Sequence, residues 1–284
     1  MVAADDSNPF CLSCRLNELI PDLSVPDNLA RWNKFETAKH HVIYTLIRLG
    51  LPMDGVPEEN RPALRFKCVA DVDGCTPVLT SHCNGLITLN IAEADDAERE
   101  RRRVKFHEPY RTLLGHLRHE VAHYYWDRLI ANSKWLSGFR ALFGDETADY
   151  AAALNQYYKQ GSPPDWQARH VSAYASAHPW EDWAETGAHY FHILDMVETA
   201  EGFGMTLAPK HPSAKTMTAT PHNAFDLNMS FDSVLANWFP LTYALNSLNR
   251  GMGLLDAYPF ALSSPAIEKL QFIHDVVQSA RVNK

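Results

Sequence analysis

The sequence lacks any hydrophobic run long enough to cross a membrane as a helix. Such a helix needs roughly 18 to 20 consecutive apolar residues, and no run of consecutive apolar residues in the 284-residue sequence approaches that length. The N-terminal residues, MVAADDSNPFC, also lack the basic start and the apolar core of a secretory signal peptide. We therefore predict a cytoplasmic protein without a membrane partner.

Positive charge is scarce as well. The chain carries 26 Lys and Arg against 34 Asp and Glu, which gives a formal net charge of -8. The basic triplet Arg101 to Arg103 lies inside the mixed-charge segment DDAERERRRVK. A nucleic-acid surface needs basic side chains clustered without such acidic neighbours. We therefore expect no nucleic-acid partner.

Cysteine is sparse and odd in number, which argues against a secreted disulfide framework. Three of the 5 cysteines, Cys68, Cys75 and Cys83, lie among strand and turn signals, where small buried thiols are common. Cys11 and Cys14 form a CxxC pair, which is half of a tetrahedral zinc site, and no second CxxC pair completes it. From the residues alone we interpret the pair as reduced thiols, leave metal binding there open, and expect one zinc per chain.

Apolar periodicity indicates a small sheet followed by helices. Residues 28–49 repeat apolar side chains every three or four positions and end at Gly50 and Pro52, which predicts an amphipathic helix. The segments LRFKCVA, PVLT and GLITLNIA predict short strands separated by turns. Further helices are predicted at about 133–160, 178–200, 231–250 and 264–281, with a loop at 205–228. This order is typical of a single α+β domain with a mainly helical C-terminal part.

A motif with metal-ligand spacing lies in a helix predicted from about Pro109 to about Ala131. His119 and His123 are four residues apart, so both imidazoles lie on one helical face and reach the same ion. Glu120 lies next to the first imidazole, where its carboxylate can reach water at the metal without binding the metal itself. The HExxH pattern therefore predicts a Zn²⁺ site with Glu120 as the general base.

A catalytic zinc takes three protein ligands and leaves one position open. Two downstream carboxylates compete for the third place. Glu181 has Glu185 one helical turn later, where it can orient a ligand imidazole through the free ring N–H. Glu146 lies between Asp145 and Asp149, which offer the same help. Periodicity does not choose between Glu181 and Glu146.

At these residues the sequence resembles the gluzincin metallopeptidases, and among them the lethal-factor-like branch. The third-ligand segment of that branch reads Tyr, six residues, Glu, two residues, Ala, Glu, and Tyr174, Glu181, Ala184 and Glu185 stand in this register. The resemblance implies that Glu181 is the third ligand and that Glu185 is the partner of a ligand histidine. It also implies that Tyr174 donates a hydrogen bond toward the oxyanion.

Over almost its whole length the chain is similar to a bacterial family of zinc-binding metallopeptidases. Members of that family usually begin with a longer zinc-ribbon-like segment, so we interpret residues 1–24 as a remnant of it and residues 25–284 as the peptidase domain. The resemblance implies a zincin-like fold, in which substrate lies along an edge strand over the metal-binding helix, and GLITLNIA is the candidate edge. The resemblance rests on FCLSCRLNELIPDLS, GLITLNIAEADDAERERRR, HLRHEVAHYYWDRL, FRALFGDETADYAAAL, HPWEDWAETGAHYFHILD and FPLTYALNSLNRGMG.

The function predicted from these residues is zinc-dependent hydrolysis of peptide bonds in a peptide or protein substrate. Two alternatives use the same site. One is a non-catalytic zinc module that binds a partner peptide, although Glu120 has no purpose in a pure binder. The other is a zinc hydrolase that acts on a non-peptide amide, for which every site residue is the same.

Overall fold

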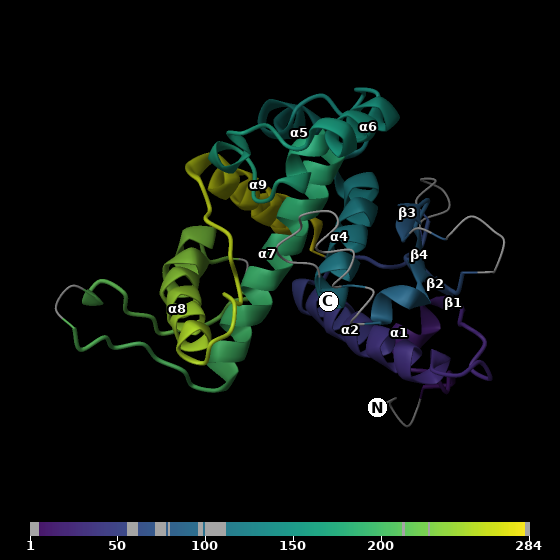
Figure 1. Cartoon of the computed structure of the whole chain (residues 1–284), viewed down its shortest axis with the longest axis horizontal. Coiled ribbons are helices and arrows are strands. Elements are labelled where there is room, and N and C mark those ends of the chain that lie inside the picture. Colours follow the sequence, from purple (N-terminus) through teal and green to yellow (C-terminus); the bar gives the residue numbers. More distant parts are fainter. Residues whose placement is uncertain are drawn as a thin grey trace.

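The computed structural model describes residues 6–55, 62–71, 78, 80–95, 99, 112–211, 214–226 and 228–281. The positions of Cys75, Pro109 and the triplet at 101–103 lie outside these residues. The fold is α+β, with a small mixed sheet and a mainly helical C-terminal part (Figure 1).

Helix α2 spans Asn28–Leu49, as the apolar periodicity predicts. Its buried face includes Phe35, Val42 and Leu46, which belong to the main hydrophobic core. Gly50 ends the helix with a left-handed φ of 66°, and its N–H reaches the carbonyls of the last turn. A residue with a side chain would be strained there, so the glycine explains why the helix stops at this point.

Within the described residues the sheet has four strands in the order β1-β2-β4-β3. Strands β1, β2 and β4 run parallel, and β3 pairs with β4 as an antiparallel hairpin. The hairpin turns at Asn84 and Gly85, which have positive φ values of 53° and 79°. The strands are β1 (Asn17–Leu19), β2 (Arg65–Val69), β3 (Ser81–Cys83) and β4 (Leu86–Asn90).

Two predictions for the sheet are wrong. GLITLNIA is predicted at an edge, but its strand β4 pairs on both sides, and the edge next to the helix that carries His119 and His123 is β3. The Asn84-Gly85 turn is the reason, because it folds residues 81–83 back along β4. PVLT was expected to be a strand, yet the described part of it, Val78 and Thr80, is not in one. Strand β1 was missed, since three residues with mostly polar side chains give no periodic signal.

The C-terminal part is built around α7, which packs against α4, α8 and α9 (Figure 1). One predicted helix, 133–160, is divided in two, because Gly144 has a φ of 106° and Asp149 caps a new helix by accepting a hydrogen bond from the Ala152 N–H. The helices are α1 (Leu12–Arg15), α4 (Leu113–Tyr125), α5 (Leu136–Phe143), α6 (Tyr150–Gln160), α7 (Pro179–Gly202), α8 (Phe231–Gly251) and α9 (Ser264–Ala280).

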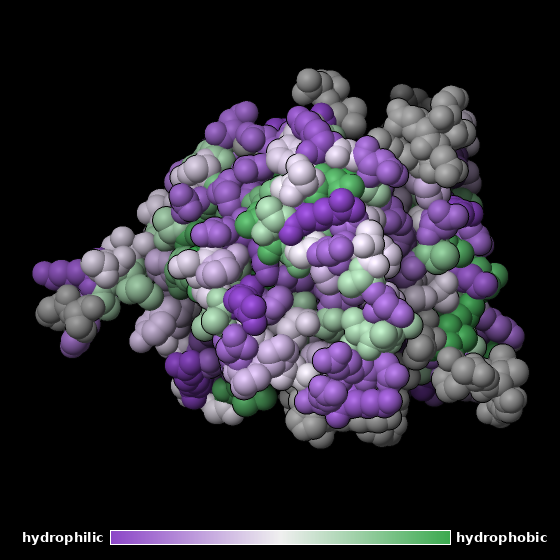
Figure 2. All heavy atoms as spheres, turned by 90° about the horizontal axis from the view of Figure 1, so that it is seen from above, coloured by the Kyte–Doolittle hydropathy of each residue, from purple (hydrophilic) through white to green (hydrophobic). Residues whose placement is uncertain are grey.

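The segment predicted as a loop, 205–228, forms an arm closed by a bridge between Leu207 and Ala219. The arm projects from the rest of the molecule beside α8, and the view from above shows the same projection (Figures 1 and 2). No described helix is both long and apolar enough to span a membrane.

Candidate metal centre

Helix α4 presents two imidazoles from successive turns. Thr112 caps the helix, its hydroxyl accepting a hydrogen bond of 2.9 Å from the Gly115 N–H. The Nε2 atoms of His119 and His123 lie 3.1 Å apart, as the spacing of four residues predicts. Both side chains are largely buried. The first two expected ligand atoms therefore face one point beside the helix.

The structure brings Glu181, and not Glu146, to this point. Glu181 lies in the first turn of α7, and its side chain is 1% exposed. Its Oε2 is 3.1 Å from Nε2 of His119, and its Oε1 is 3.5 Å from Nε2 of His123. Glu146 instead forms an ion pair with Arg140, whose Nε lies 2.9 Å from its Oε2.

The separations within this group match the needs of a tetrahedral zinc ion. Zn–N and Zn–O bonds of usual length place neighbouring ligand atoms about 3.3 to 3.5 Å apart. The two Nε2 atoms are 3.1 Å apart, and those of His119 and His123 lie 3.1 and 3.5 Å from Oε2 and Oε1 of Glu181, respectively. Oε2 of Glu181 is buried and makes no hydrogen bond of good geometry to any described residue. A buried carboxylate oxygen without such a partner is costly unless a cation compensates it. His119, His123 and Glu181 therefore fit a zinc ion.

Glu185 orients one of the two imidazoles. Its Oε1 lies 2.7 Å from Nδ1 of His119 and, because a carboxylate only accepts, the ring N–H donates. The opposite nitrogen, Nε2, is then free to point its lone pair into the site. Ser172 donates a hydrogen bond of 2.5 Å to the other oxygen of Glu185. Burial opposes ionisation of Glu185, but His119, His189 and Ser172 together outweigh it and keep the pKa of this carboxyl below its usual value.

A second pair of carboxylates flanks His116, one turn before His119. Its Nδ1 lies 2.6 Å from Glu93 Oε2, and its Nε2 lies 3.3 Å from Glu120 Oε1. Burial alone would lower the pKa of His116, yet the two carboxylates raise it to about 9. Burial likewise opposes ionisation of Glu120, but His116, with smaller contributions from His119 and His123, keeps its pKa below the usual value. A charged imidazolium thus holds Glu120 ionised and limits its rotation.

Tyr150 is a site residue that the sequence analysis missed. It begins α6 and donates a hydrogen bond of 2.6 Å to Oε1 of Glu181. In the segment DETADY, only the carboxylates signal metal binding. The contact between Tyr150 and Glu181 joins two helices, so it produces no periodic pattern in the sequence. The one available signal is an aromatic residue directly after Asp149, the N-cap of α6.

Tyr174 lies beside the group in a short 3₁₀ helix, Tyr174–Ala177. Its ring centroid is 6.0 Å from that of His119 and 5.6 Å from that of Tyr157. Burial, and after it the charge of Glu181, raises the pKa of Tyr174 well above its ordinary value. The hydroxyl therefore stays protonated, and a hydrogen bond with Tyr158 contributes to this.

Three other histidines near α7 have structural partners instead. His178 caps the helix, its Nδ1 accepting from the Trp180 N–H, and its Nε2 donates to the Ala148 carbonyl. His189 bonds to the Tyr258 hydroxyl, and His192 stacks on the same ring. None of the three belongs to a candidate ligand group within the described part of the chain.

Comparisons with known proteins agree with this chemistry. The sequence matches a family described as "Putative zinc-binding metallo-peptidase" over residues 28–276, which is most of the chain. The chain belongs to this family. Proteins of Mycobacterium bovis and Mycobacterium tuberculosis, both described as uncharacterized, are 43% identical over 278 residues, covering 98% of this family member and 78% of each relative. No solved structure gave a significant match.

Proposed function

We propose that the protein is a zinc-dependent peptidase of the gluzincin type, with His119, His123 and Glu181 as the ligands. The observation that carries this proposal is the convergence of the three ligand atoms beside Glu120, a buried carboxylate that belongs to none of the ligand contacts. Family membership supports peptidase activity at a coarser level.

Zinc, when bound, makes water more acidic and polarises the carbonyl of the scissile bond. Glu120 accepts the proton of the attacking water and afterwards delivers it to the leaving amine. His116, held by Glu93, keeps that carboxylate ionised until the proton arrives. Because the base is fixed by an ion pair, little reorganisation is needed when the proton moves.

Two tyrosines serve different purposes in this mechanism. Tyr174, close to His119, donates a hydrogen bond to the developing oxyanion, a contact whose loss typically costs about 2.7 to 4 kcal/mol of barrier. Tyr150 instead bonds to Oε1 of Glu181 and so holds the ligand carboxylate in place. Glu185 holds His119 in the same way.

The alternatives, a non-catalytic peptide-binding module and a hydrolase of non-peptide amides, share this site. Incubating the protein with a library of unstructured peptides, with and without a metal chelator, separates them. We expect new peptide termini that appear only without chelator and return when zinc is restored. Peptide binding without cleavage would support the binding module. If the protein neither binds nor cleaves the peptides but hydrolyses simple amides, this result would support the non-peptide hydrolase.

A further inference from the structure

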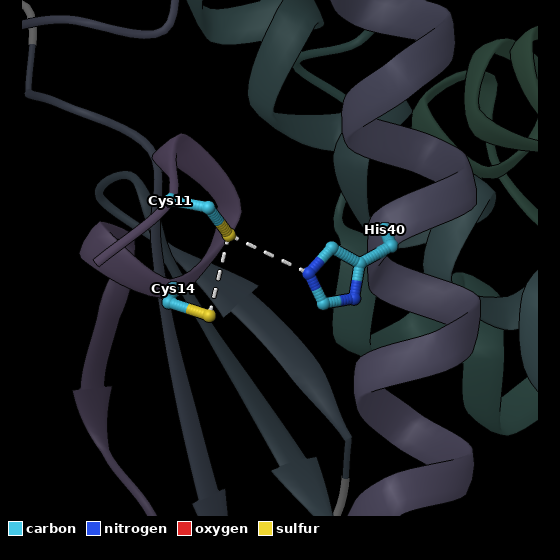
Figure 3. Close-up of side chains that lie close together, drawn as sticks. All are labelled: Cys11, Cys14 and His40. Carbon is cyan, nitrogen blue, oxygen red and sulfur yellow. Dashed lines mark hydrogen bonds between the residues drawn. The ribbon is translucent and has the colours of Figure 1, made fainter. Parts of the chain in front are cut away.

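A second group of metal-ligating side chains, which shares no residue with the first, lies between the N-terminal segment and α2. Cys11 caps the short helix α1, Cys14 lies within it, and His40 projects from α2. Figure 3 shows both sulfur atoms turned toward the imidazole ring. The two Sγ atoms are 3.4 Å apart, and the Cys11 Sγ lies 3.7 Å from Nε2 of His40. All three ligand atoms lie within 4.8 Å of one another.

These separations are those of ligands around one ion. Zn–S bonds of about 2.3 Å and Zn–N bonds of about 2.0 Å place tetrahedral sulfurs about 3.8 Å apart and a sulfur and a nitrogen about 3.5 Å apart. Both cysteines are free thiols. Their sulfurs are also farther apart than the roughly 2.05 Å of a disulfide bond.

The imidazole of His40 is oriented for a ligand. Its Nδ1 lies 2.6 Å from the carbonyl oxygen of Glu36, one turn earlier on α2. A carbonyl only accepts, so Nδ1 carries the hydrogen and Nε2 directs its lone pair toward the sulfurs. A backbone carbonyl that fixes the second nitrogen is one of the common partners of a zinc-bound histidine.

We propose that Cys11, Cys14 and His40 are ligands of a second zinc ion, separate from the ion of the proposed catalytic site. Two thiolates and one imidazole are a typical donor set for zinc. The ion would fasten α1 to α2 and thereby hold β1, which follows α1 directly and forms an edge of the sheet. The count expected from sequence alone then rises from one zinc per chain to two, because His40 is close to the cysteines only in the folded chain.

Zinc content and cobalt spectra of the full chain test this site independently of catalysis. We expect two zinc ions per chain in the parent protein and one in His40→Asn or Cys14→Ser. The matched controls His41→Asn and Cys83→Ser alter an exposed histidine and an exposed free thiol outside the group, and both should keep two. Titration with Co²⁺ should produce thiolate-to-cobalt absorption in the parent and in a His119→Ala, His123→Ala variant, and this absorption should vanish in Cys14→Ser.

The double variant separates this site from the proposed catalytic one. If it keeps one zinc with thiolate ligands, the N-terminal site exists whether or not the protein is a peptidase. The inference is overturned if the parent shows no thiolate-to-cobalt absorption, or if His40→Asn retains the same metal content as His41→Asn. Ready oxidation of Cys11 and Cys14 to a disulfide, with unchanged zinc content in Cys14→Ser, would instead identify a redox dithiol. Because His40 is exposed, its replacement leaves the core intact and the comparison remains interpretable.

Discussion

Gly187 on α7 faces Ala122 on α4 so closely that a Cβ at position 187 would lie 2.7 Å from the Cβ of Ala122. The indole N–H of Trp183, one turn earlier on α7, donates a hydrogen bond of 2.8 Å to the Ala122 carbonyl. The two helices that carry the ligand atoms thus meet almost backbone to backbone. Only a residue without a side chain permits this approach.

Gly187→Ala should push α4 and α7 apart and weaken zinc binding. Overpacking of this kind costs about 1 to 3 kcal/mol, and the displaced helices would carry Glu181 away from His119. The control is Gly202→Ala at the end of the same helix, where an added Cβ meets nothing within 4 Å. Thermal unfolding and zinc affinity measured for both variants would test this. Equal behaviour of the two would contradict the close approach.

The choice of third ligand predicts opposite effects for two glutamates. Glu181→Ala should remove the metal or weaken its binding strongly, since it deletes one of three ligands. Glu146→Ala should keep zinc bound, because that carboxylate pairs with Arg140 and lies outside the ligand group. Zinc content after desalting measures the difference, and circular dichroism confirms that both variants fold. The reverse pattern of metal loss would also remove the role proposed for Tyr174.

Replacing the base should separate metal binding from turnover. Glu120→Gln keeps the shape of the side chain but cannot accept a proton, so zinc content should equal that of the parent while peptide cleavage is abolished. Cleavage rates and metal content are measured on the same preparation. Activity within tenfold of the parent would remove Glu120 from the mechanism.

The ion pair behind Glu120 predicts a change in the pH profile. His116 lowers the pKa of Glu120, and the base works only when ionised, above that pKa. His116→Gln removes the positive charge, so the pKa of Glu120 should rise and the acid limb of kcat/KM should move to higher pH. A lower rate with an unmoved acid limb would mean that His116 acts only on packing.

Buried His189 should contribute to acid sensitivity. Burial lowers its pKa to about 4 in the folded protein, against about 6.5 in an unfolded chain. The unfolded chain therefore binds a proton first, so this contribution is complete above pH 6.5 and is lost as pH falls toward 4. The loss amounts to at most about 3 kcal/mol. His189→Gln should reduce the slope of unfolding free energy against pH in this interval, as measured by urea titration, and an unchanged slope would contradict the assignment.

Local signals predicted the fold where the responsible residues are close in sequence. The bounds of α2 follow from its apolar period and from Gly50, and the paired histidines follow from a spacing of one turn. The sheet order could not be predicted in this way, because the Asn84-Gly85 hairpin decides which strand lies at the edge. The break between α5 and α6 was visible only as Gly144 and Asp149 within an otherwise helical pattern.

The residues of the candidate site follow the same rule: those that stand in a sequence register are predicted, and those that meet only through helix packing are not. Glu185 was expected as the partner of a ligand histidine from the family register, and the structure places it against His119. The contacts of Tyr150 with Glu181 and of Glu93 with His116 join different elements of the chain. Their partners are set by how the helices pack, which apolar periodicity does not describe.

Because the proposed ligands come from α4 and α7, zinc bound to them would help to keep the chain folded. An unfolded chain still holds His119 and His123 as neighbours, but it has lost Glu181 and binds the ion far more weakly. A ligand that prefers the native state stabilises it by about 2.7 kcal/mol when its free concentration is a hundred times its dissociation constant. Withdrawal of zinc would therefore shift molecules toward the unfolded ensemble, where proteases act on them, and the amount of this protein in a cell would follow the zinc available to it.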